Sequence, residues 1–195
     1  DDYFHADPKA PDMTYARRGG FLSAVEFNPL EFGIAPRDIE ATDTTQLLGL
    51  VAAKQALTDA GVVLAGEKKD QQGADAPRSP KAVHRDRVSV ILGVTGTLEL
   101  VIPLGARLGH PRWKRAMLEA GIPADQAEDA AGRIADSYVP WQENSFPGLL
   151  GNVVAGRIAN KLDLGGTNCV VDAACASSLS AVHLAALELQ TGKCD

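Results

Sequence analysis

Thr167-Asn-Cys-Val-Val-Asp-Ala-Ala-Cys-Ala-Ser-Ser-Leu179 decides the fold, because a β-branched run ends here and a helical pattern begins. Residues Thr167 to Asp172 predict a short buried strand. From Ser177 to Gln190 the pattern predicts a helix with one apolar face. That face consists of Leu179, Val182, Ala186 and Leu189, at steps of 3, 4 and 3. The stretch therefore predicts a strand, a tight turn and a helix.

Cys175 falls at this predicted turn. A residue there lies at the positive end of the helix dipole, near backbone N–H groups that have no helical partner. Such a place favours the thiolate, which is the nucleophilic form of cysteine. The small neighbours Ala173, Ala174 and Ala176 leave room for a sharp turn, as glycines do in the nucleophile elbow of hydrolases. From these residues alone, Cys175 is either a nucleophile or a buried, inert cysteine.

The rest of the chain alternates strand and helix patterns. Val88 to Val94 is almost continuously apolar, which is typical of a strand covered on both faces. Further helices are predicted from the cap Thr42–Asp43 to Gly61 and over 111–121, 125–138 and 149–161. Gly93 to Gly96 predicts a close-packed turn, and the polar stretch 66–87 predicts a surface loop or insertion. The alternation predicts an α/β protein with a mainly parallel sheet.

Asp172-Ala-Ala-Cys-Ala-Ser-Ser-Leu179 resembles the active-site signature of the β-ketoacyl synthases, the condensing enzymes of fatty acid and polyketide synthesis. The resemblance extends over nearly the whole chain. It includes Phe27–Arg37, Val88–Val94 and Asn152–Asp172, while Leu92–Leu100 and Trp141–Pro147 are most similar to multidomain synthases of polyunsaturated fatty acids. Asn28 and Thr44 depart from the usual pattern and bear on subfamily only.

The resemblance implies a thiolase-like layered fold, α-β-α-β-α. Residues 1–195 would form its N-terminal half, without the first strand and the C-terminal half. Cys175 would take an acyl chain from the phosphopantetheine arm of an acyl carrier protein, with its own backbone N–H as an oxyanion donor. Condensation with malonyl-carrier and loss of CO₂ would then give a 3-oxoacyl thioester. No cofactor would be bound by this segment itself.

The same resemblance implies that two histidines needed for the chemistry lie beyond this chain, so the segment alone is expected to be inactive. His183 is a poor substitute, because eight helical positions separate it from Cys175, about 12 Å of rise. Ser177 and Ser178 are expected to cap the helix or to bond to the backbone. Asp172 either orients the turn or only ends the strand with a local hydrogen bond.

Two further expectations come from the family. The strand Thr167–Asp172 would pair with its copy in a homodimer; the alternative is an inner strand of one subunit. Phe146 would line an acyl tunnel or serve as a core aromatic. Two other functions stay open: a thiolase-type enzyme acting on coenzyme A esters, and a non-catalytic dimerisation or chain-length module.

Composition narrows the function classes. The 195 residues carry 45% apolar and 23% charged residues and a formal net charge of −6, which argues against a nucleic-acid partner. No apolar run reaches the roughly 18–20 residues of a membrane helix. Three cysteines without paired spacing argue against a disulfide framework and a metal site, and favour the cytoplasm.

Overall fold

The computed structural model describes residues 3–62 and 84–195, so most of the predicted 66–87 loop lies outside the described residues. Two parallel strands, β1 (Val90–Gly93) and β2 (Asn168–Val171), form the sheet. The α-helices are α1 (Thr44–Asp59), α2 (Leu98–Arg107), α3 (His110–Glu119), α4 (Ala124–Asp136), α5 (Ser145–Gly148), α6 (Val153–Lys161) and α7 (Ser177–Gln190). Short 3₁₀ helices are η1 (Pro29–Phe32), η2 (Pro36–Asp38), η4 (Arg85–Arg87) and η5 (Ala174–Ala176). The predicted α/β class is confirmed.

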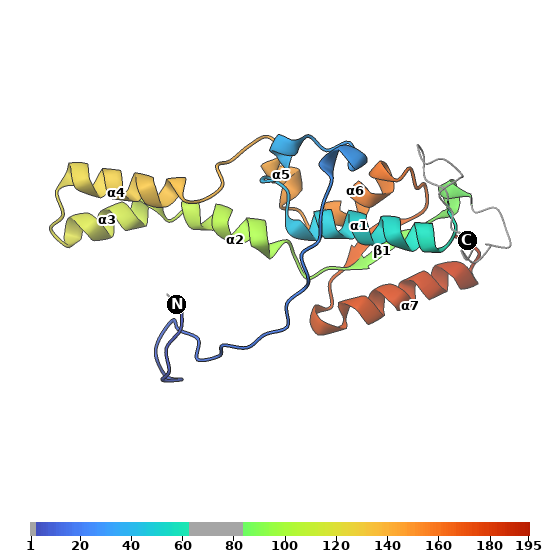
Figure 1. The fold of residues 1–195 in the computed structure, drawn as a ribbon, viewed down its shortest axis with the longest axis horizontal. Helices are drawn as coiled ribbons and strands as arrows, with labels where there is room; N and C mark the ends of the chain where they lie inside the picture. The colour runs from blue at the N-terminus through green and yellow to red at the C-terminus, as the bar shows by residue number, and fades with distance from the viewer. Residues whose placement is uncertain (1–2, 63–83) are drawn as a thin grey trace.

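Helices cover the sheet on both sides. Figure 1 shows α1 and α6 on one side of the strands and α7 on the other. The strands pair in register from Val90 opposite Asn168 to Gly93 opposite Val171. Because side chains alternate across a strand, each strand presents residues to both helical layers. The short sheet is thus the middle layer of an α-β-α arrangement. The turn with Cys175 follows the C-terminal end of β2.

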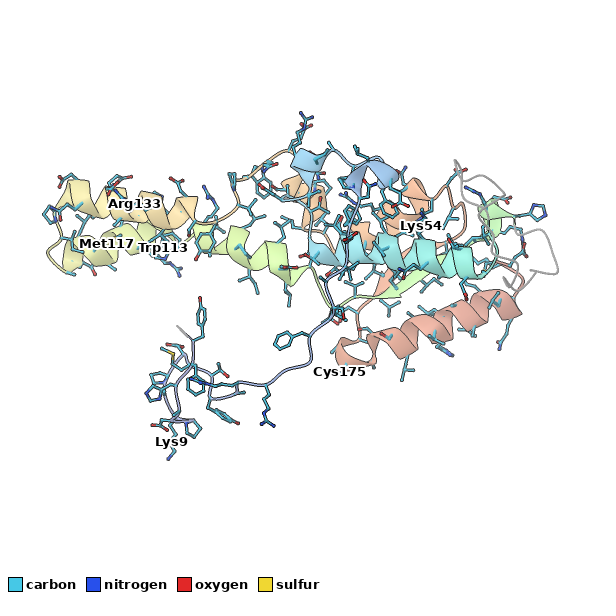
Figure 2. All side chains as sticks on the ribbon, viewed as in Figure 1. Lys9, Lys54, Trp113, Met117, Arg133 and Cys175 are labelled. Carbon is cyan, nitrogen blue, oxygen red and sulfur yellow. The ribbon has the colours of Figure 1, made fainter. Side chains whose placement is uncertain are left out.

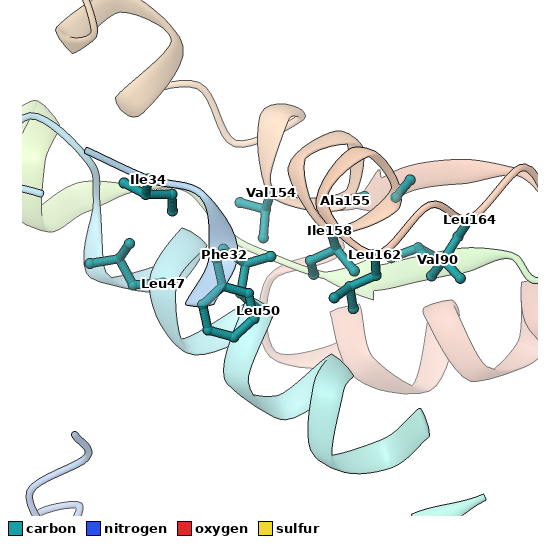
Figure 3. Close-up of a cluster of buried hydrophobic side chains, with 11 residues drawn as sticks. Phe32, Ile34, Leu47, Leu50, Val90, Val154, Ala155, Ile158, Leu162 and Leu164 are labelled. Carbon is teal, nitrogen blue, oxygen red and sulfur yellow. The ribbon is translucent and has the colours of Figure 1, made fainter. Parts of the chain in front are cut away.

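The main core lies between α1, α6 and the sheet. Leu50 of α1 and Ile158 of α6 are fully buried, and Val154 is 1% exposed (Figure 3). Phe32 and Ile34 close this cluster from the segment that precedes α1. Apolar burial of this kind stabilises a fold by about 25 cal/mol per Å² removed from water. It fixes the sheet against the α1–α6 layer.

Helix α2 was not predicted. The sequence pattern indicated only the turn that ends at Gly96, yet residues Leu98–Arg107 form a helix with Pro103 inside it. Its first turn is held from a distant part of the sequence, because Asp43 Oδ2 accepts a hydrogen bond from the Leu100 amide at 3.0 Å. With α3 and α4, which pack on each other, α2 forms an arm that extends from the body (Figure 1). A capping bond across 57 residues cannot be seen in a local pattern.

The apolar face predicted for α7 does not pack against the sheet. Leu179, Val182 and Leu189 are 76%, 65% and 56% exposed, and Ser177 and Ala181 are buried instead. The reason lies in Gly93 at the end of β1. A Cβ atom there would stand 2.5 Å from the Ser177 carbonyl carbon and 2.6 Å from the Ser178 nitrogen. The helix and strand approach so closely that only small side chains fit between them.

Candidate active site

The chain turns sharply between β2 and α7. After Val171 it passes through Asp172 and Ala173 into η5, and α7 follows directly at Ser177. Cys175 is the middle residue of η5, its side chain is exposed, and Figure 2 shows it beside the start of α7. The sequence predicted this strand–turn–helix position. The alternative of a buried cysteine does not apply.

The residue before the cysteine has an unusual backbone. Ala174 has φ +48°, in the left-handed region that residues with a Cβ atom rarely adopt. Its N–H donates to Asp172 Oδ1 at 3.0 Å, and its carbonyl accepts from Ser177 Oγ at 2.6 Å. Side chains on either side of the turn therefore hold both polar groups of Ala174.

Ser177 connects the turn to the end of β1. Its Oγ also accepts from the Ala173 amide at 2.9 Å and lies 3.4 Å from Thr95 Oγ1. Because the Ser177 hydroxyl donates to Ala174, Thr95 is the donor in the second contact. The residue is 5% exposed. Its hydroxyl is thus engaged in backbone bonding, as expected from the sequence, rather than presented as a nucleophile.

The Cys175 amide is available to a ligand. The next two amides bond back within the turn, Ala176 N–H to the Ala173 carbonyl and Ser177 N–H to the Ala174 carbonyl. In residues 3–62 and 84–195 the Cys175 N–H has no hydrogen-bond partner. An unpaired amide at a helix start can stabilise a developing oxyanion on an atom bonded to the neighbouring sulfur.

No base accompanies the thiol in the described chain. Among those residues, no hydrogen bond or ion pair joins a side chain to the Cys175 sulfur. His183 is exposed on α7, eight residues from Cys175, and His110 begins α3 in the arm. At about 1.5 Å of rise per residue, His183 is well beyond the ~3 Å needed for proton transfer. The described residues therefore place no acid–base group beside the exposed Cys175 thiol.

Phe146 lies in a different region from Cys175. It is 59% exposed on α5, which Figure 1 places on the α1 side of the sheet, opposite α7. The backbone after it is firmly held. Gln46 Nε2 donates to the carbonyls of Pro147 and Gly148, both at 2.9 Å, and the Thr97 hydroxyl donates to that of Leu149.

Sequence reasoning missed Asp43, Gln46 and Thr97 as organising residues; Asp43 had been noted only as a helix cap. All three are polar and at most 2% exposed, and they join the starts of α1 and α2 to the segment 145–150. One signal existed: Gln46 stands four positions before Leu50, on the apolar face of α1. A polar residue on a buried face needs hydrogen-bond partners.

Other site types have no support among the described residues. No group of three or more His, Cys, Asp or Glu side chains there could hold a metal ion, and all three cysteines are free thiols. No helix in that part of the chain has the length and apolar character needed to cross a bilayer. The strand-to-helix turn with Cys175 is the candidate site.

This geometry defines an α/β protein with an exposed cysteine at a nucleophile elbow. Residues 1–195 match the sequence profile described as "Beta-ketoacyl synthase, N-terminal domain". The chain belongs to the β-ketoacyl synthase family, which confirms the resemblance and the thiolase-like fold class.

The relatives are large synthases. A polyunsaturated fatty acid synthase subunit of Thraustochytrium sp. is 36% identical over 194 residues, which cover 99% of this chain and 6% of that protein. Polyketide synthase GfsB of Streptomyces halstedii is 30% identical over 100% of this chain and 3% of its own length. Pikromycin polyketide synthase component PikAII of Streptomyces venezuelae is 30% identical over 98% of this chain and 4% of its own. The chain thus spans a small fraction of each relative.

Proposed function

We propose that this chain is the nucleophile-bearing segment of a condensing enzyme in fatty acid or polyketide synthesis. The observation that carries the proposal is the exposed Cys175 thiol at the amino end of α7, next to an amide without a partner. A thiol can hold an acyl chain as a thioester, and the amide can stabilise the oxyanion formed on the way. Membership in the family supports this reading.

The proposed reaction has two steps, transfer of an acyl group to Cys175 and condensation with malonyl-carrier. The Cys175 thiolate attacks the carbonyl of an acyl thioester on a carrier's phosphopantetheine arm, and that arm leaves as a thiol after taking up a proton. A malonyl-carrier then loses CO₂, and its carbanion attacks the Cys175 thioester. A carbon–carbon bond forms, the bond to sulfur breaks, and a 3-oxoacyl-carrier is released together with the Cys175 thiolate.

The described residues would do only part of this work. Cys175 binds the acyl group and its amide stabilises charge, but no base stands beside it among residues 3–62 and 84–195. We therefore expect residues 1–195 alone not to condense substrates. Histidines that promote decarboxylation and proton transfer would come from other parts of the synthase.

The partners follow from the chemistry. The proposed partner is an acyl carrier protein or domain, which brings the phosphopantetheine, and the segment itself needs no bound cofactor. A homodimer through Thr167–Asp172 is also proposed. Phe146, on the α1 side of the sheet, is proposed to line an acyl chain at a point away from the Cys175 sulfur. The net charge of −6 argues against nucleic acid, and three free thiols favour a reducing compartment such as the cytoplasm.

The test uses the intact synthase that contains this chain. Iodoacetamide labelling followed by peptide mass spectrometry should show Cys175 reacting fastest of the three thiols near neutral pH. Cys175→Ala should reduce formation of 3-oxoacyl product on the order of 10³-fold or more, because the covalent step is lost. Cys169→Ala, at a half-buried strand position, is the matched control and should retain activity.

Two outcomes would contradict the proposal: equal labelling of the three thiols, or undiminished product from Cys175→Ala. The acyl donor that Cys175 accepts distinguishes the condensing enzyme from the thiolase-type enzyme and the non-catalytic module. Acylation of Cys175 by acyl-carrier and not by acyl-coenzyme A supports the condensing enzyme, whereas efficient acylation by coenzyme A esters supports the thiolase-type reading. Absence of any acylation supports a non-catalytic module.

A further inference from the structure

In the turn before Cys175, the residue with left-handed backbone is an alanine, Ala174. Ala174 has φ +48°, a conformation that glycine adopts freely and that a Cβ atom disfavours. In the Gly-x-Ser-x-Gly elbow, glycines on both sides of the nucleophile make such a turn possible. Here the flanking residues are Ala173, Ala174 and Ala176. Something other than glycine must therefore keep the turn in shape.

Two side chains act on Ala174 directly. Asp172 Oδ1 accepts the Ala174 N–H at 3.0 Å, and Ser177 Oγ donates to the Ala174 carbonyl at 2.6 Å. Ser177 also accepts the Ala173 N–H at 2.9 Å, so the peptide groups on both sides of Ala174 are tied. These bonds favour the observed backbone over a relaxed turn with negative φ.

Ser177 has a fixed position of its own. It is 5% exposed at the first position of α7, where the helix backbone meets Gly93 of β1. Thr95, just after β1, reaches its hydroxyl at 3.4 Å. The sheet thus holds Ser177, and Ser177 holds the turn. Asp172 works from the other side, directly after β2.

We propose that Asp172 and Ser177 are positioning residues that hold Ala174 left-handed and so aim the Cys175 thiol and amide together at one acyl carbonyl. The backbone dihedrals of Ala174 set where the next residue points its N–H and its Cα–Cβ bond. Attack on a thioester needs sulfur on the carbonyl carbon and the amide on its oxygen at once. This inference rests on the proposed function.

Simple alkylation makes no such demand. Iodoacetamide requires an accessible thiolate and no oxyanion donor. Loss of positioning should therefore slow acyl transfer much more than alkylation, whereas a loss of thiol reactivity would slow both. This difference separates positioning from a general effect on the cysteine.

The experiment compares variants of the intact synthase with acyl-carrier as acyl donor and with iodoacetamide. Asp172→Ala and Ser177→Ala should each slow acylation of Cys175 by about 10- to 100-fold, with alkylation within about threefold of the unmodified protein. Asp172→Asn keeps the Oδ1 acceptor and should stay within about threefold in both assays. Ser178→Ala removes an exposed neighbouring hydroxyl and is the matched control.

Rescue gives the decisive readout. Ala174→Gly should restore acylation of both slow variants to within about threefold, because glycine takes positive φ without the two side-chain bonds. Normal acylation of Asp172→Ala and Ser177→Ala would overturn the inference, and so would slow variants that Ala174→Gly fails to rescue. If the unmodified Cys175 reacts with iodoacetamide but is not acylated, the proposed function itself fails.

Discussion

Glu188 connects the end of α7 to the start of β1, and its charge has a measurable role. Its carboxylate accepts hydrogen bonds from Lys193 Nζ at 2.8 Å and from Ser89 Oγ at 2.7 Å. These bonds, led by the one from Lys193, lower the pKa of Glu188 from an ordinary 4.5 to about 2. The ionised form is therefore favoured more strongly in the folded state than in the unfolded chain.

The sign of the pH effect follows from this difference. A depressed carboxyl pKa adds stability that is complete above about pH 4.5 and is lost as the pH falls toward 2. We expect Glu188→Gln to reduce the pH dependence of unfolding in this window, as measured by urea titration of the intact protein at several pH values. Glu119→Gln, at the exposed end of α3, is the control and should leave the curve unchanged. Superimposable curves for Glu188→Gln and the unmodified protein would contradict the prediction.

At the residue scale, the sequence alone predicted where Cys175 lies but not the contacts that hold the turn before it. The pattern around Cys175 predicted an exposed position at a helix start, and the structure places it there. It left two roles open for Asp172, orienting the turn or ending the strand with a local hydrogen bond, and the bond to the Ala174 amide is present. The sequence pattern did not predict the positive φ of Ala174, because an alanine does not indicate left-handed backbone. That conformation depends on Ser177, whose position is set by the distant strand β1.

At the scale of elements, one carboxylate joins two helices. Asp43 Oδ1 caps α1 through the Thr45 amide at 2.9 Å, and Oδ2 accepts the Leu100 amide in the first turn of α2 at 3.0 Å. The side chain is 2% exposed, so water cannot replace it. Negative charge near both helix starts also complements their dipoles.

Asp43→Ala should therefore destabilise the protein by about 2–4 kcal/mol, since it removes a cap and leaves a second amide without its acceptor. Urea unfolding of the intact protein measures this loss. Asp59→Ala, at the exposed C-terminal end of the same helix, should change the stability by no more than about 0.5 kcal/mol. If both variants unfold at the same urea concentration, the double capping role is wrong.

Local periodicity predicted the elements that depend on local signals. Helix α1 begins at its predicted cap, and β1, β2 and α6 lie within their predicted ranges. It failed where distant residues decide. The first turn of α2 is capped by Asp43, 57 residues away, and the close approach at Gly93 leaves room only for small residues of α7. Both failures come from tertiary contacts overriding a local pattern.

At the scale of the whole molecule, much apolar surface remains uncovered. α7 has apolar residues on several sides, and Leu179 and Val182 on it are 76% and 65% exposed. Ile102 on α2 and Leu108 directly after it are 64% and 81% exposed. A helix that is apolar on most sides is usually buried. We therefore expect these faces to be covered in the larger synthases to which this segment is related.

The unpaired edge of β2 is the surface that we propose for the homodimer. The Thr167 and Val171 carbonyls accept hydrogen bonds from the amides of Val90 and Val94, so these alternate residues face β1. Because direction alternates along a strand, the amides of Asn168 and Val170 point to the other edge. Among the described strands nothing pairs with that edge. An unpaired edge is a template for a strand from a second copy.

Asn168→Pro removes one of these outward amides and leaves the bonds to β1 in place, since proline is tolerated at a strand edge. In the intact synthase it should raise the dimer dissociation constant by about tenfold or more, as measured by analytical ultracentrifugation, because a backbone bond across the interface is lost and the pyrrolidine ring blocks close approach. Asn168→Ala keeps the amide and should dimerise like the unmodified protein. Equal dissociation constants for the proline and alanine variants would place the dimer contact elsewhere, since only the proline variant lacks the outward N–H.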